Sequence, residues 1–168
     1  MDTTPTTPSL LAELDALPAR WEVHGTLPAP VDAVVALLLS VAEGRVGDDN
    51  LLVLARAPAA RQGAMTVVAG AAAGAYRAEF AGSLSPVDIE VDRPGSRLAV
   101  QSWYAGVHTA EACAAGTRVT HRVHRLRPEH PGFTAGTAEA GLRARMSRDL
   151  RHVLAVIADR LGCGPPTA

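Results

Sequence analysis

Apolar side chains recur at helical spacing along residues 134–161. At about 100° per residue they fall within an arc of about 120°, which is the pattern of an amphipathic helix that covers a core. The members of this stripe are Leu142, Met146, Leu150, Val153, Leu154, Ile157 and Leu161. With a rise of about 1.5 Å per residue, such a helix is roughly 40 Å long and crosses a small domain. We therefore expect a long C-terminal helix to organise the fold.

Two charged residues interrupt the apolar stripe near the start of this helix. Glu139 and Arg143 occupy the core-facing arc and are spaced i, i+4 with the acid first, which is the favourable order. An unpaired buried charge costs several kcal/mol, so this end of the helix faces water or a polar cavity. Two interpretations remain: the helix overhangs the sheet here, or Glu139 and Arg143 line the mouth of a pocket.

The N-terminal part of the chain changes its pattern several times. Residues 1–8 are rich in Thr and Pro and are expected to be disordered, and a short helix follows on Leu10, Leu11, Leu14 and Leu17. Strict alternation from Trp21 to Leu27 predicts a half-buried strand. Pro30 suits the first turn of a helix that carries apolar residues up to Val41 and ends at Gly44.

From residue 51 onward the pattern becomes short strands separated by turn residues. We expect strands near 51–56, 64–70, 75–81, 86–92, 97–104, 107–113 and 117–126. This regular spacing favours an antiparallel meander, so the chain is predicted to be an α+β protein with its helices on one face of a curved sheet. The expected organisation is a tail and extra helix over 1–19, one domain over 20–162 and a tail over 163–168.

The loops of the last three strands set the predicted register. A three-residue loop Ala114-Ala115-Gly116, with Gly116 in the left-handed region, and a two-residue turn Ala105-Gly106 are assumed. One face then carries most of the aliphatic residues and should face the long helix. Its polar members are Ser102, Tyr104, Thr109, Glu111 and His121. A change of one residue in either loop reverses the relative facing of neighbouring strands.

In this register Glu111 lies diagonally beside His121, roughly 7 Å away along the backbone. A carboxylate next to an imidazole fixes its tautomer and raises its basicity, as a general base requires. We therefore treat His121, Glu111 and Tyr104 as candidate catalytic residues. The alternative is a core histidine with a structural carboxylate partner. His121 and His124 point to opposite faces, which disfavours a shared metal, and no metal or cofactor is expected.

Composition narrows the classes of partner. The chain has 168 residues, a net charge of −1 and 48% hydrophobic residues, which fits one domain with a sizeable core and gives no general attraction to nucleic acid. No apolar run is long enough for a membrane span. Two cysteines without a C-x-x-C motif and the absence of an export signal in Met1 to Pro8 favour a cytoplasmic protein.

The order of these elements resembles the SRPBCC superfamily, also called START/Bet v 1-like or polyketide-cyclase-like. The resemblance covers about residues 20–161. It is carried by the strand Trp21–Leu27 running into Ala29-Pro30-Val31-Asp32-Ala33-Val34, by Asp92-Arg93-Pro94-Gly95 with Leu98, and by Gly116-Thr117-Arg118-Val119-Thr120 before the long helix. It implies a helix-grip architecture, in which a seven-stranded antiparallel sheet wraps round the C-terminal helix and leaves a hydrophobic cavity.

The resemblance implies three classes of function. The first is binding of a small hydrophobic or polyketide-like molecule, with cyclase or dehydratase chemistry by His121 and Glu111. The second is a non-catalytic carrier or sensor, and the third is an Hsp90-activator-like interaction module. A homodimer is compatible with each of them. The residues expected to contact the ligand are Ser102, Thr109, Tyr76, Phe80, Glu139, Arg143 and Met146.

Overall fold

The computed structural model describes residues 9–47, 50, 65–81, 86–126 and 135–167. Within them, one antiparallel sheet of eight strands has the order β1-β8-β7-β6-β5-β4-β3-β2. The strands are β1 (Trp21–Leu27), β2 (Gly44–Arg45), β3 (Met65–Ala69), β4 (Ala75–Phe80), β5 (Val87–Asp92), β6 (Arg97–Gln101), β7 (Tyr104–Cys113) and β8 (Gly116–Leu126). Three helices accompany them: α1 (Leu10–Asp15), α2 (Val31–Leu38) and α4 (Ala135–Leu161). The predicted helix-grip arrangement of an α+β protein is confirmed.

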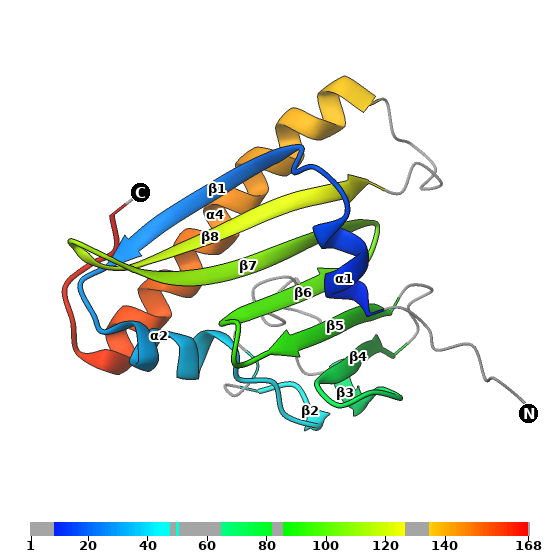
Figure 1. The fold of residues 1–168 in the computed structure, drawn as a ribbon, viewed down its shortest axis with the longest axis horizontal. Coiled ribbons are helices and arrows are strands. Elements are labelled where there is room, and N and C mark those ends of the chain that lie inside the picture. The colour runs from blue at the N-terminus through cyan, green and yellow to red at the C-terminus, as the bar shows by residue number, and fades with distance from the viewer. Residues whose placement is uncertain (1–8, 48–49, 51–64, 82–85, 127–134, 168) are drawn as a thin grey trace, which may run out of the picture.

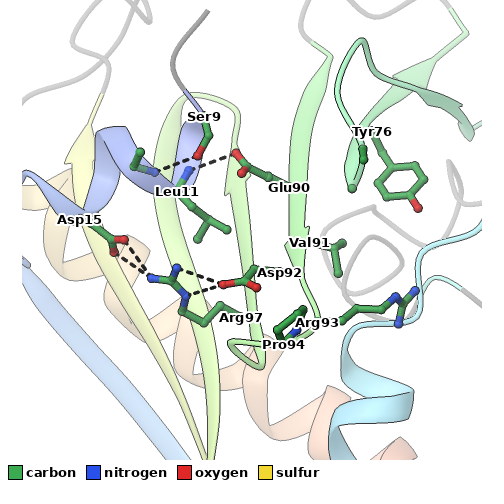
Figure 2. Close-up of a pocket in the computed structure, with 13 residues that line it drawn as sticks. Ser9, Leu11, Asp15, Tyr76, Glu90, Val91, Asp92, Arg93, Pro94 and Arg97 are labelled. Atoms are coloured by element: carbon green, nitrogen blue, oxygen red, sulfur yellow. Dashed lines mark hydrogen bonds and ion pairs between the residues drawn. The ribbon is translucent and has the colours of Figure 1, made fainter.

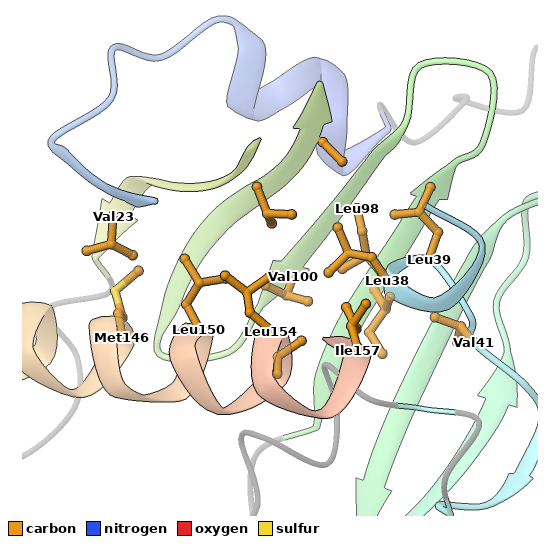
Figure 3. Close-up of a cluster of buried hydrophobic side chains, with 14 of the residues drawn as sticks. Val23, Leu38, Leu39, Val41, Leu98, Val100, Met146, Leu150, Leu154 and Ile157 are labelled. Carbon is orange, nitrogen blue, oxygen red and sulfur yellow. The ribbon is translucent and has the colours of Figure 1, made fainter. Parts of the chain in front are cut away.

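Helix α4 runs along one face of the sheet, which we call the inner face (Figure 1). Six of the seven residues of its predicted apolar stripe are buried, and only Leu161 at its end is partly exposed. Figure 3 shows Leu150, Leu154 and Ile157 pointing from α4 toward Val100 and Leu38. This main core covers the inner face because the inward positions of the strands are aliphatic and alternate with polar residues.

Most predicted strands lie within a few residues of the observed ones, with two differences in the region between α2 and β3. The strand expected at 51–56 and the tail 1–8 fall outside the described residues. The second helix ends at Leu38 instead of near Gly44, which has φ +108° and starts the short strand β2. With that extra strand the described sheet has eight strands, where the resemblance implied seven.

Helix α1 occupies the opposite, outer face of the sheet, so the expectation of all helices on one face is wrong. Leu11 and Leu14 are buried there in a second, smaller core. Their partners on the sheet are Ala99, Ala105 and Val107. These outward positions of β6 and β7 are apolar, and burying them removes apolar area from water. Figure 1 shows α1 lying across β5, β6 and β7 on the side away from α4.

The C-terminal segment after α4 returns to the margin of the sheet. Thr167 and Thr26 form an isolated antiparallel bridge, in which the Thr26 N–H donates to the Thr167 carbonyl at 2.7 Å and the reverse bond is 2.9 Å. β1 has β8 as its only strand neighbour in the sheet order, so this bridge covers part of its other side. The segment therefore ties the end of the chain to an edge strand.

Candidate functional site

A row of four rings lies on the inner face where β6, β7 and β8 meet. The rings of Trp103 and Tyr104 meet edge to face with centroids 5.0 Å apart, and Tyr104 is followed by His121 at 6.1 Å. His121 and His108 stack with centroids 3.7 Å apart and planes inclined by 23°. Both histidines are buried, with 3% of each exposed, whereas Trp103 is half-buried. The row thus runs from a partly accessible indole to a buried imidazole pair.

Pairing of β7 with β8 explains why the two imidazoles meet. His108 and His121 are direct cross-strand partners, so both side chains leave the sheet on the same side. Gly106 provides the room that the His121 ring uses. A Cβ built on Gly106 would lie 2.7 Å from His121 Nε2 and 2.6 Å from the Arg122 carbonyl oxygen. Any side chain at position 106 therefore competes with the imidazole for the same space.

The predicted register of β7 is wrong, and with it the predicted His121–Glu111 pair. The hairpin loop has two residues, Ala114 and Ala115, and Gly116 pairs with Cys113. Gly116 does take a positive φ of 121°, as expected, but it belongs to the strand. Shortening the loop by one residue turns the side chains from Val107 to Cys113 to the other face, whereas a register shift between Ala105 and Gly106 leaves Tyr104 on the inner face.

Glu111 consequently lies on the outer face, exposed, opposite Arg118. Thr109 is half-buried on the same outer face, opposite Thr120. Neither side chain shares a face with His121, so the structure separates two of the predicted site residues from the others.

Of the other residues expected to contact a ligand, several lie at the main core, whereas Ser102, predicted on the inner face of a strand, lies in a turn. Tyr76 and Phe80 are half-buried and pack against the main core, to which Tyr104 and Met146 belong. Ser102 lies in the turn between β6 and β7, where its backbone N–H donates to the Tyr104 carbonyl at 2.9 Å. The inner face therefore brings His121 and Tyr104 together with apolar residues expected to contact a ligand.

Sequence reasoning missed His108 and Trp103. The turn between β6 and β7 was placed at Ala105-Gly106, whereas Gln101 pairs with Ala105 across Ser102–Tyr104. A signal was present: Gly106 two residues before His108 marks a place where backbone and a neighbouring side chain approach closely.

Glu139 and Arg143 line a cleft of about 580 Å³ between the start of β1 and α4, together with Arg20 and Trp21. Arg20 Nη2 lies 3.4 Å from Glu139 Oε2, and both side chains are largely exposed. The structure thus places Glu139 and Arg143 in the wall of a cleft. This cleft opens at the seam of strand and helix.

A second cleft, of about 590 Å³, lies beneath α1 on the outer face (Figure 2). Arg97 joins its walls: the guanidinium donates to both carboxylate oxygens of Asp15 at 3.1 and 2.9 Å and to Asp92. Glu90 accepts the Leu11 backbone N–H at 3.1 Å. These bonds attach α1 to the β5–β6 hairpin, so we interpret this cleft as a structural joint.

The charges of this joint shift two pKa values. The pKa of Asp92 is lowered, first by the hydrogen bond that its carboxylate accepts from the Gly95 N–H and then by the one from Arg97. The pKa of Arg97 is raised by its hydrogen bonds to Asp15 and then Asp92. Both shifts favour the charged forms in the folded state.

This joint predicts an acid-sensitive contribution to stability. Because the pKa of Asp92 in the folded state lies below 3.8, its stabilising contribution is fully present above that value and is lost as the pH falls through the folded-state pKa. Asp92→Asn is therefore expected to lower the urea midpoint at about pH 6 and to change it much less at about pH 2. Asp88→Asn is the control, since its ion pair with Arg77 is exposed on both sides. An equal effect of Asp92→Asn at both pH values would contradict the assignment.

Two further observations concern membranes and metal ions. Within the part of the chain that the structure describes, no helix is both long and apolar enough to cross a membrane. Among the same residues, no group of three His, Cys, Asp or Glu side chains is arranged to hold a metal ion.

Comparison with known proteins identifies the fold. No protein-family model matches the sequence, and no curated protein sequence matches it. A crystal structure of the Zhui aromatase/cyclase from Streptomyces sp. R1128 matches 84% of this chain and 94% of its own, with a TM-score of 0.51 and 17% identity. The structure of Ara h 8.0201 matches 83% of this chain and 97% of its own, with a TM-score of 0.51 and 11% identity. The chain therefore shares the helix-grip fold of these two structures.

Proposed function

We propose that this chain binds a small, largely apolar aromatic molecule of polyketide type on the inner face of its sheet, beside Trp103 and Tyr104. The observation that carries the proposal is the row of rings from Trp103 to the His121–His108 pair. Binding sites for small molecules combine apolar and aromatic walls with a few polar groups that fix orientation. Here the indole and phenol rings supply the wall, and the imidazoles supply the polar groups.

Partly exposed aromatic side chains occur on β4 as well as in the turn before β7. Tyr76, Phe80 and Trp103 all pack against the main core, yet each keeps some exposed surface. Covering that surface with an apolar ligand gains about 25 cal/mol per Å² of apolar area removed from water. The ligand class is supported by the fold, since one solved structure with this fold is an aromatase/cyclase.

In a catalytic form of this function, a cyclase or dehydratase, His121 would accept the proton from the carbon α to a ligand carbonyl. The Tyr104 hydroxyl would donate a hydrogen bond to the developing enolate oxygen. The neighbour of His121 in this scheme is His108, in place of Glu111. Stacking against the His108 ring fixes the orientation of the His121 imidazole. Binding without turnover would make the chain a carrier or sensor.

The two tryptophans of the chain, Trp21 and Trp103, make a direct test. Emodin, a tricyclic aromatic polyketide, is titrated into ¹⁵N-labelled protein while the two indole N–H resonances are followed. We expect a saturable shift of the Trp103 resonance, because the ligand ring lies against that indole. Trp21→Phe and Trp103→Phe assign the two signals.

A matched pair of variants tests the polar end of the site. His121→Asn is expected to weaken emodin binding by about fivefold, which corresponds to the loss of one hydrogen bond of roughly 1 kcal/mol. His24→Asn, on the outer face of β1, should leave the affinity unchanged. The absence of a saturable shift at Trp103, or equal weakening by the two histidine variants, would overturn the proposal.

A further inference from the structure

The cleft between β1 and α4 has the composition of a site for an organic acid. Its walls carry two guanidinium groups, Arg20 and Arg143, against one carboxylate, Glu139. Arg143 is exposed and makes no ion pair among the described residues, whereas Arg20 is paired with Glu139. The cleft therefore holds one positive charge in excess, on a side chain whose planar fork of donors fits a carboxylate.

Trp21 adds a second, independent observation. It lines the cleft, and its side chain also belongs to the main core, with 9% of the residue exposed. Its indole Nε1–H is buried, and no hydrogen-bond acceptor is found for it within the described part of the chain. Buried N–H groups are nearly always paired, so this donor is an unused one beside the cleft.

We propose that this cleft binds a small aromatic carboxylate, at a site separate from the row of rings on the inner face. The ligand carboxylate pairs with Arg143 and lies beside the Trp21 indole, whose N–H is buried in the ligand-free structure and becomes a donor to the same group once the side chain shifts toward the cleft. The aromatic part of the ligand lies along the small side chains Ala140 and Ala144 of α4, which also line the cleft. The site does not depend on the function proposed above.

The Glu139–Arg20 ion pair indicates how the cleft distinguishes an anionic ligand from a neutral one. Glu139 and Arg20 both line the cleft, and their 3.4 Å contact is long for a charge-assisted hydrogen bond. An incoming carboxylate therefore competes with Glu139 for Arg20 while Arg143 remains available. A neutral ligand of the same shape has no such partner, so the cleft selects for negative charge.

The experiment uses 4-nitrobenzoate as the probe and 4-nitrobenzamide as its neutral isostere, with the Trp21 indole N–H resonance as the readout. We expect the carboxylate to shift that resonance saturably and the amide to bind at least about tenfold more weakly, which is roughly 1.4 kcal/mol. Arg143→Gln should weaken carboxylate binding about tenfold, and Glu139→Gln should strengthen it. Arg148→Gln, an exposed arginine on α4 outside the cleft, is the matched control and should leave affinity unchanged.

Three results would overturn the site: equal affinity for acid and amide, equal effects of Arg143→Gln and Arg148→Gln, or a shift confined to the Trp103 resonance. The last result would place the acid on the inner face instead. Because emodin binding is followed at Trp103 and acid binding at Trp21, the failure of one proposal leaves the other standing.

Discussion

Replacing Leu154 by alanine is expected to lower the free energy of unfolding by about 2–5 kcal/mol, the range for deleting a buried leucine side chain. Leu154 is 1% exposed and belongs to the main core between α4 and the sheet. A Cβ built on Gly25 would lie 2.5 Å from Leu154 Cδ1. Because Gly25 has no side chain, Leu154 can pack directly against the backbone of β1. Urea denaturation monitored by circular dichroism measures the change.

Arg151→Ala is the matched control for Leu154→Ala. Arg151 lies three residues earlier on the same helix and is exposed, so its replacement changes helix propensity but creates no cavity. We expect an effect within about 0.5 kcal/mol. Equal destabilisation by the two variants would mean that α4 is not held by its apolar stripe.

The second large effect is expected at Gly106. A methyl group there would meet the Arg122 carbonyl oxygen and the His121 ring, and the backbone atom cannot move aside without disturbing the β7–β8 ladder. Gly106→Ala is therefore expected to destabilise the fold by about 1–3 kcal/mol, as overpacking does. It should also weaken emodin binding, because the imidazole pair is displaced. Thermal denaturation and the Trp103 titration measure the two effects.

Gly141 gives the opposite expectation for the same chemical change. It is exposed within α4, and a Cβ built there meets nothing within 4 Å. Gly141→Ala should stabilise the protein by about 0.5–1 kcal/mol, because alanine loses less conformational freedom than glycine in a helix. If Gly106→Ala were also stabilising, the close approach of His121 to β7 would be wrong.

The helices and most strands could be predicted because their signals are local. The stripe from Leu142 to Ile157 needs only the periodicity of one helix, and the alternation from Trp21 to Leu27 needs only one strand. The side of the sheet on which α1 packs could not be predicted from such local patterns. Ala99 and Ala105 are small residues that suit either face, and only the docking of Leu11 and Leu14 decides between them.

The site was harder to predict because the face of the sheet on which a side chain lies depends on the lengths of the loops between strands. One residue fewer in the loop at Ala114-Ala115 exchanged Glu111 for His108 on the inner face. His121 kept its predicted face because the turn between β6 and β7 also differed from the assumed one, so the two differences reversed β7 between its neighbours and left the facing of β8 relative to β6 unchanged. A polar cluster could thus be anticipated near His121, while its membership required the observed pairing.

The bridge between Thr26 and Thr167 has a consequence for how copies of this chain meet. An open sheet presents unpaired N–H and C=O groups along its marginal strands, and these are templates for the addition of a strand from another molecule. At Thr26 both groups are already engaged by the chain's own terminal segment. The segment thereby hinders another molecule from adding a strand to β1 at this position. Prolines and β-bulges have the same effect on edge strands of other β proteins.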